Sequence, residues 1–260
     1  MKFVVSDLDG TLLQPDHKIS NYSIDVIKKL VDKNINFVIA TGRGKPGVQD
    51  VLNQLGLDIY LICNNGANIY DKKGNLICEE VITPEISSQI LKEIKNAGLF
   101  YSAFKENVFY RDKDDTEEYF TRELFNEVIL ENLNKCPELN KIIVTNDNPE
   151  EILKISNLLR KKFNSLVEIT ISQHTCLDIS PKYCSKGSGI KHLAKIFNIS
   201  TNEFMAFGDG ENDLDMLRTV GHPVIMANAQ EIVKNEFSTI TSTNIQDGVA
   251  KYLARYFNLQ

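Results

Sequence analysis

Residues 2–12 read KFVVSDLDGTL, and this stretch decides both the fold and the chemistry that the chain can carry. A short apolar run, Phe3 to Val5, is typical of a buried strand and leads directly into two carboxylates, Asp7 and Asp9. Side chains at positions i and i+2 of a strand point the same way, so we expect both carboxylates to leave the strand end together. Two like charges about 4 Å apart repel by roughly 4 kcal/mol at an effective dielectric near 20. A hard cation such as Mg²⁺, or a proton on one member, relieves that repulsion.

The composition is that of an ordinary soluble globular protein, and it excludes several classes of partner. The chain has 260 residues, of which 42% are hydrophobic and 25% charged, enough for one large or two modest domains. Its net charge of −6 argues against nucleic acid or an anionic membrane as the main partner. No apolar run approaches the ~20 residues of a membrane span, and the first residues are too few for a signal peptide. Five cysteines without C-x-x-C spacing suit reduced thiols, so we expect a cytoplasmic protein.

Strands and helices alternate in the first third of the chain. A helix pattern starts at Ser20, a buried strand follows at 36–40, a helix at 46–55 and a further strand at 58–63. This alternation predicts an α/β fold with a doubly wound parallel sheet. Such sheets bind ligands at the carboxyl ends of their strands, where Asp7, Asp9 and Thr41 are expected to lie.

The pattern changes at Thr83. From there to Ser185, strands and helices mix without regular alternation, and a charged helix is expected over about 116–132. We therefore predict an α+β domain at 83–185, inserted into a core formed by 1–82 and 186–260.

A second acidic stretch follows a strand near the carboxyl-terminal end of the chain. The strand at 203–207 runs into Gly208-Asp209-Gly210-Glu211-Asn212-Asp213, and a lysine, Lys186, opens the helix before it. Together with Asp7, Asp9, Thr41 and Gly42, these groups are expected at one sheet edge. Carboxylates there would hold a divalent cation, while the lysine, the hydroxyl and backbone N–H groups would hold phosphate oxygens. An ionised Asp, with an ordinary pKa of ~3.9, needs no base to act as a nucleophile at such a site.

These residues resemble the four motifs of the haloacid dehalogenase superfamily of aspartate-nucleophile phosphotransferases. In order, the matching residues are Asp7-Leu8-Asp9-Gly10-Thr11, Thr41-Gly42-Arg43, Lys186 and Gly208-Asp209-Gly210-Glu211-Asn212-Asp213. The inserted domain is similar to the large cap of the Cof-type sugar-phosphatase subgroup, with class IIB topology. The resemblance covers essentially the whole chain and implies a Rossmann-like core with that cap.

The resemblance also implies a role for each motif residue. Asp7 would attack phosphorus, and Asp9 would act as general acid and then base. The metal would be held by Asp7, the backbone carbonyl of Asp9, Asp209 and Asp213, the last directly or through water. Phosphate contacts are expected from the backbone at Leu8 and from Thr41, Gly42, Lys186 and Asn212. Arg43 is expected in the site, on the substrate side, or paired with a local carboxylate.

The function predicted from the sequence is a Mg²⁺-dependent phosphatase acting on small phosphorylated metabolites such as sugar phosphates, with the cap choosing the leaving group. Two alternatives stay open. One is a phosphosugar mutase of the same superfamily, and the other is a phospho-accepting regulatory protein. Receiver domains of the second kind are much shorter and lack an inserted cap. The physiological substrate and the oligomeric state cannot be read from the sequence.

Three other motif interpretations are weaker. Gly42 to Gly47 fits G-x-G-x-x-G, but it follows the second strand, and Pro46 removes an N–H from the turn meant to hold pyrophosphate. The P-loop pattern fails because Val48 stands where it requires lysine. The acidic stretch at Asp209 fails the calcium-loop pattern because Leu214 replaces the turn glycine.

Overall fold

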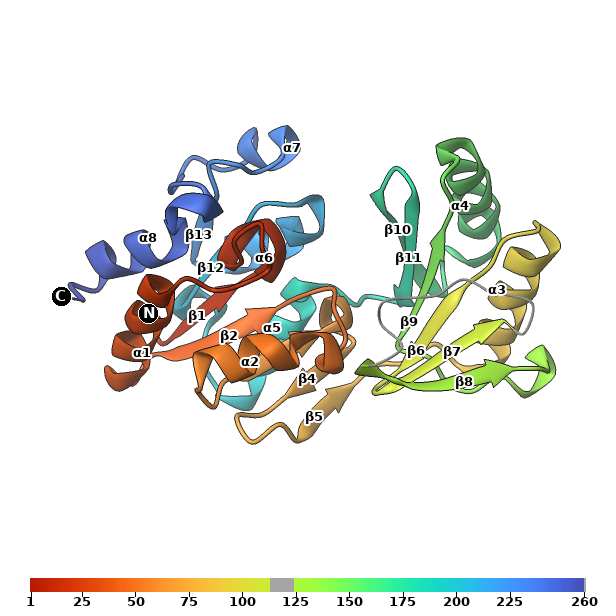
Figure 1. Ribbon diagram of the computed structural model, residues 1–260, viewed down its shortest axis with the longest axis horizontal. Coiled ribbons are helices and arrows are strands. Elements are labelled where there is room, and N and C mark those ends of the chain that lie inside the picture. Colours follow the sequence, from red (N-terminus) through yellow and green to blue (C-terminus); the bar gives the residue numbers. More distant parts are fainter. Residues whose placement is uncertain (113–123, 260) are drawn as a thin grey trace. The chain divides into compact units, whose positions relative to one another are not determined.

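The fold of the chain is given by a computed structural model, which describes residues 1–112 and 124–259 (Figure 1). The chain divides into two compact units. The core unit comprises residues 1–43, 48–78 and 185–260, and the cap unit comprises 44–47 and 79–184. The boundaries expected after residues 82 and 185 stay predictions. Within the described ranges, no helix is long and apolar enough to cross a membrane.

The sheet of the core unit places the first strand at its centre. Among the described residues it has seven strands, in the order β13-β12-β1-β2-β3-β4-β5. The strands are β1 (Phe3–Ser6), β2 (Asn36–Ala40), β3 (Tyr60–Cys63), β4 (Asn68–Tyr70), β5 (Leu76–Glu79), β12 (Phe204–Gly208) and β13 (His222–Ile225). The first three and last two are parallel, whereas β4 pairs antiparallel with β3. The carboxyl ends of β12, β1, β2 and β3 therefore meet at one edge, as the α/β prediction requires.

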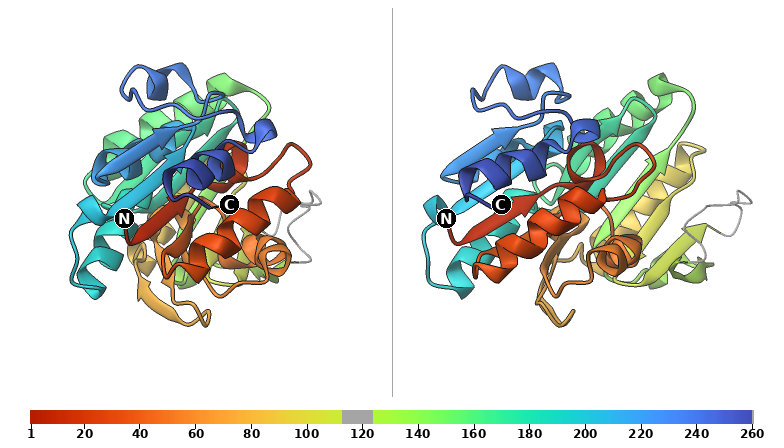
Figure 2. Two further views of the ribbon diagram at one scale, coloured as in Figure 1. Left: turned by 90° about the vertical axis from the view of Figure 1, so that its left-hand side faces the viewer. Right: turned by 60° about the vertical axis from the view of Figure 1, so that its left-hand side comes forward.

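Helices cover both faces of this sheet, because alternate residues of each strand point to opposite sides. On β1, Val4 packs into the layer under α1 (Asn21–Asp32), α2 (Gln49–Leu55) and α8 (Gly248–Tyr256). Val5 packs into the layer under α5 (Lys186–Ile196), α6 (Leu214–Thr219) and α7 (Glu231–Lys234). Figure 2 shows α1 and α8 side by side over one face. The doubly wound architecture is thereby confirmed.

The cap unit has its own sheet and its own hydrophobic core. Its strand order in the described part of the chain is β10-β11-β9-β6-β7-β8. The strands are β6 (Ser102–Lys105), β7 (Val108–Asp112), β8 (Asn126–Leu130), β9 (Lys141–Thr145), β10 (Val167–Gln173) and β11 (Cys176–Pro181). Two amphipathic helices, α3 (Pro84–Asn96) and α4 (Pro149–Phe163), bury Ile90, Leu91, Ile152 and Leu159 in that core. The expected α+β composition of the insertion is confirmed.

One predicted element of the cap is wrong in part. The helix expected over 116–132 falls partly on residues 113–123, which lie outside the described part of the chain. Over the rest, Asn126–Leu130 is the strand β8, which pairs parallel with β7. The run Val128-Ile129 has β-branched side chains that lose rotamer freedom in a helix, and strand pairing outweighed the charged pattern of the segment.

Candidate active site

A wide turn after β1 positions the first aspartate. The backbone N–H of Asp7 donates to the carbonyl of Phe207 at 3.0 Å, which ties the end of β1 to β12. The N–H of Leu13 reaches back to the carbonyl of Leu8 at 2.9 Å and closes the turn. Within this turn Gly10 adopts a φ of +80°, a left-handed conformation that favours glycine. The result is a buried Asp7 side chain at the carboxyl edge of the sheet.

Asp7 is joined at this edge by the two aspartates that follow β12. One carboxylate oxygen from each of Asp7, Asp209 and Asp213 lies within 4.8 Å of the others. The hydroxyl of Thr11 donates to Asp209 Oδ1 at 2.7 Å. Asp213 Oδ2 accepts from the backbone N–H of Asp209 at 2.9 Å and of Gly210 at 3.0 Å. These bonds fix the orientation of both carboxylates.

Lys186, the first residue of α5, bridges two of the three carboxylates. Its Nζ donates to Asp7 Oδ1 and to Asp213 Oδ1, each at 2.6 Å, and its side chain is fully buried. The helix start is fixed by Ser185, whose Oγ accepts from the N–H of Ser188, while the Ser188 hydroxyl accepts from the N–H of Ser185. This capping box sets the point at which the lysine enters the site.

The pKa values in the site are set by burial and by the closeness of three carboxylates to one ammonium group. Burial raises the pKa of Asp7 to about 8; Lys186 opposes the shift and the charge of Asp213 adds to it. Burial also raises the pKa of Asp209 to about 6, against the hydrogen bond from Thr11. Burial disfavours the charged form of Lys186, but attraction to Asp213 and Asp7 outweighs it and holds its pKa above the ordinary value. The lysine is therefore a cation, and the carboxylates repel one another.

This donor set fits a hard divalent cation. Asp7, Asp209 and Asp213 offer only carboxylate oxygens, the ligands that Mg²⁺ and Ca²⁺ prefer, and two of the three side chains are oriented by hydrogen bonds from behind. A cation among them would favour their ionised forms, which burial alone disfavours.

The neighbouring strand ends supply further groups from the expected set. Thr41, buried after β2, accepts a hydrogen bond at Oγ1 from the N–H of Arg43 at 3.1 Å. Asn212 is exposed, and its Nδ2 lies 3.5 Å from Asn65 Oδ1. The same Asn65 oxygen would lie 3.2 Å from a Cβ at Gly42. Thr41, Gly42 and Asn212 thus lie around Asn65.

The side chain of Asp9 lies outside the carboxylate cluster. It is half exposed and forms an ion pair with Arg43, whose Nε donates to Asp9 Oδ2 at 2.8 Å. His17 Nδ1 is 3.6 Å from the other oxygen of Asp9. Arg43 thus pairs with a carboxylate that is itself an expected site residue, and its expected place on the substrate side stays a prediction.

Two residues at this edge were missed as site residues in the sequence. Asn65 has a positive φ, as do its neighbours Asn64 and Gly66, and its N–H donates to the Thr41 carbonyl at 3.0 Å. The polar run Asn64 to Gly66 directly after the third strand was the available signal. Thr11 was quoted in the first motif, but its bond to Asp209 spans 198 residues and has no local signature.

The structure is that of an α/β protein with a polar site at the sheet edge, where a buried aspartate follows the central strand beside a bridging lysine and two further aspartates. Comparison with known proteins gives the family. The model of the haloacid dehalogenase-like hydrolases matches residues 4–253, so the chain belongs to that family.

The relatives agree over nearly the full length. An HMP-PP phosphatase of Serratia proteamaculans (strain 568) is 32% identical over 255 residues, covering 96% of this chain and 93% of that protein. A crystal structure of a Thermotoga maritima protein has a TM-score of 0.85 and 31% identity, with 98% and 97% of the two chains covered. A HAD subclass IIB sugar phosphatase has a TM-score of 0.83 and 24% identity, with all of both chains covered. The family and the fold expected from the four motifs are confirmed, as is the class of enzyme, a phosphatase-type hydrolase.

Proposed function

We propose that the chain is a Mg²⁺-dependent phosphatase that hydrolyses small phosphorylated metabolites, sugar phosphates among them, through an aspartyl phosphate on Asp7. The observation that carries the proposal is the buried contact of Lys186 Nζ with both Asp7 and Asp213, next to Asp209. No other group of described residues combines a fixed ammonium with a carboxylate triad of this kind.

The first step forms a bond between a carboxylate oxygen of Asp7 and phosphorus. The bond from phosphorus to the leaving oxygen breaks, and Asp9 gives a proton to that oxygen. In the second step water attacks the phosphorus of the aspartyl phosphate and Asp9 takes its proton. Inorganic phosphate leaves, and Asp7 is restored.

The ion pair between Asp9 and Arg43 bears on these steps. Arg43 donates to both carboxylate oxygens of Asp9, so the group that would deliver the proton is held by the guanidinium and not by the substrate. The general acid therefore requires that Arg43 turn away, and the natural new partner for its guanidinium is the substrate phosphate. Arg43 would then release Asp9 as it binds the substrate.

The charge of the transferring phosphoryl group is met by fixed groups of the chain. Lys186 is already a cation and is held at 2.6 Å from the nucleophile, so it needs no rearrangement to stabilise the developing charge. Asp7, the Asp9 backbone carbonyl, Asp209 and Asp213 would hold Mg²⁺, which supplies further positive charge to the phosphate oxygens when bound. Thr41, Gly42, Asn212 and the Leu8 backbone would contact the phosphate.

The proposed substrate class rests on the relatives, which differ in the phosphorylated compound named for each. One relative is an HMP-PP phosphatase, and a structural neighbour is a sugar phosphatase. We therefore propose that the leaving group is a small polar metabolite, recognised by the cap unit.

The test is phosphate release from p-nitrophenyl phosphate with Mg²⁺ and with EDTA, by the natural chain and by Asp7→Asn. We expect metal-dependent turnover that Asp7→Asn abolishes. Full activity in Asp7→Asn would overturn the nucleophile assignment. A panel of sugar phosphates and HMP-PP then identifies the leaving group. Absence of turnover, with a stable acyl phosphate after treatment with acetyl phosphate, would favour the mutase or regulatory alternatives.

A further inference from the structure

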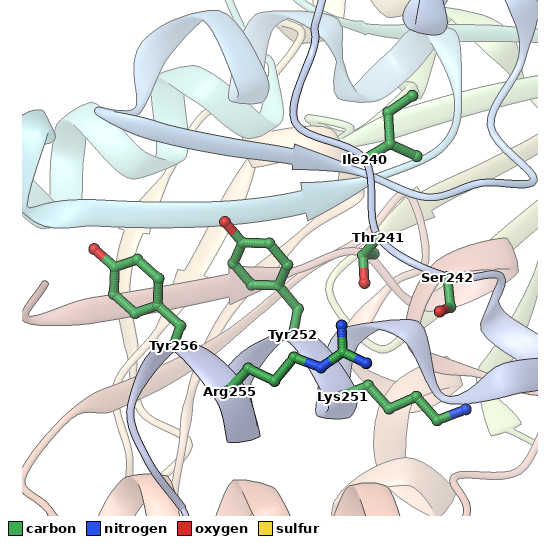
Figure 3. Close-up of a pocket in the computed structure, with 7 residues that line it drawn as sticks. All are labelled: Ile240, Thr241, Ser242, Lys251, Tyr252, Arg255 and Tyr256. Carbon is green, nitrogen blue, oxygen red and sulfur yellow. The ribbon is translucent and has the colours of Figure 1, made fainter.

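A groove of about 470 Å³ lies on the core unit between α8 and the extended segment Ile240 to Ser242 (Figure 3). Its walls are held by backbone bonds: the N–H of Thr241 donates to the Ile225 carbonyl at 2.9 Å, so the segment runs along β13. The Thr241 hydroxyl donates to the Gly248 carbonyl at 2.7 Å and ties the segment to the start of α8. Both walls are thus fixed by the fold. The volume is within the range of small-ligand sites.

The groove carries two cations in a protein whose net charge is −6. Lys251 and Arg255 line it from α8, and neither side chain has a hydrogen bond or ion pair to another residue within the described ranges. The carboxylate of Asp247, one turn before Lys251, accepts instead from Gln14 and Ser23, each at 3.3 Å. Figure 3 shows the guanidinium of Arg255 reaching toward Thr241 and Ser242, with Lys251 beside it. One end of the groove therefore favours an anion.

Two tyrosine rings form the other part of the wall. The rings of Tyr252 and Tyr256 are nearly parallel, with centroids 6.1 Å apart. Tyr252 is held in place by its hydroxyl, which lies 2.6 Å from His222 Nε2, and by an edge contact with Phe207. Figure 3 shows both rings side by side, away from the Lys251 end of the groove. They offer an apolar, planar surface that suits an aromatic or other flat body.

We propose that this groove is a binding site, separate from the carboxylate cluster, for a small organic phosphate or phosphonate with a planar ring. The anionic group would pair with Lys251 and Arg255, and the ring would lie against Tyr252 and Tyr256. Guanidinium pairs bidentately with phosphate oxygens, which matches an anionic group better than a neutral polar one. The proposal does not depend on the proposed function.

The probe is phenylphosphonate, whose P–C bond resists phosphatases, titrated into the full chain by calorimetry. The test variant is Lys251→Gln with Arg255→Gln. The matched control is Lys28→Gln with Lys161→Gln, two exposed lysines that remove the same charge elsewhere. We expect saturable binding to the natural chain and to the control, and binding at least about tenfold weaker in the test variant, since each charge-assisted bond contributes more than a neutral one.

A second arm tests the ring. Tyr256→Leu is expected to weaken phenylphosphonate binding severalfold while leaving methylphosphonate binding unchanged. If Tyr256→Leu unfolds, the charge variants decide alone, because both positions lie on the surface of α8. Equal affinity in all charge variants would place the phosphonate elsewhere, at the carboxylate cluster for example, and would overturn the proposal. So would the absence of saturable binding at millimolar phenylphosphonate.

Discussion

Both the backbone conformation at Gly10 and the space around it exclude a larger residue. Its φ of +80° costs an L-residue about 1–2 kcal/mol, and a Cβ would lie 2.4 Å from Asp209 Oδ2. Gly56, at the end of α2, has a similar φ of +59° but open space around it. Comparing the same substitution at the two glycines therefore separates the effect of backbone strain from the effect of displacing Asp209.

We predict that Gly10→Ala abolishes most phosphate release, because the new methyl group displaces Asp209. Gly56→Ala, the control, should lose about 1 kcal/mol of unfolding free energy and keep its activity. Urea denaturation and the p-nitrophenyl phosphate assay measure the two effects. Equal activity in both variants would contradict the role given to the Gly10 contact.

Thr11 orients Asp209, one of the proposed metal ligands, through the hydrogen bond that its hydroxyl donates. Thr11→Val keeps the shape of the side chain and removes the hydroxyl that donates to Asp209. We predict that half-maximal activity then requires about tenfold more Mg²⁺, as for other residues that orient metal ligands. The control is Thr170→Val, on an exposed position of a cap strand. An unchanged Mg²⁺ requirement in Thr11→Val would show that Asp209 needs no such support.

The sequence predicted the positions of some site residues but not the side-chain contacts of others, for a physical reason. Asp7, Lys186, Asp209 and Asp213 follow strand ends or begin a helix, and parallel topology alone brings such positions to one edge. The pairing of Asp9 with Arg43 and the bond from Thr11 to Asp209 depend on side-chain rotamers, which no spacing in the chain encodes.

At the scale of the element, α5 matters most, because its first residue is the bridging lysine. Ser185 caps this helix and also contacts the carboxylate of Asp215 at the start of α6. We predict that Ser185→Ala lowers the unfolding free energy by about 1 kcal/mol and also reduces turnover. Ser200→Ala removes a similar cap from the one-turn segment before β12 and is the control. Its activity should stay unchanged. A full kcat in Ser185→Ala would show that Lys186 is placed by its own contacts alone.

Secondary structure was predicted best where the spacing of apolar residues and the capping residue indicated the same helix. The helix α1 begins after the side-chain cap Ser20 and has an amphipathic face, and its start was located within one residue. The strand β8 was missed because it lies at a sheet edge with most of its side chains exposed, so its pattern carries no alternation of burial.

At the scale of the whole molecule, only one of the two units contains the carboxylate cluster. A ligand that binds the native state alone stabilises it by about 2.7 kcal/mol at a hundred times its Kd. We predict that Mg²⁺ slows amide hydrogen exchange in β1 and β12 relative to EDTA and leaves β9 and β11 unchanged. Mass spectrometry of peptides from these strands measures both. Equal slowing in the two sheets would show that the units open together.

The central place of β1 also sets an order of events during synthesis. The ribosome makes β1 long before one of its two neighbours, β12, which begins only at Phe204. At ~5–20 residues per second, β12 emerges roughly 10–40 s after β1. The cap sheet, by contrast, is drawn from one continuous segment between these two strands. We expect the nascent cap to gain structure while β1 still exposes an unpaired apolar edge, the interval in which a chaperone would bind this chain.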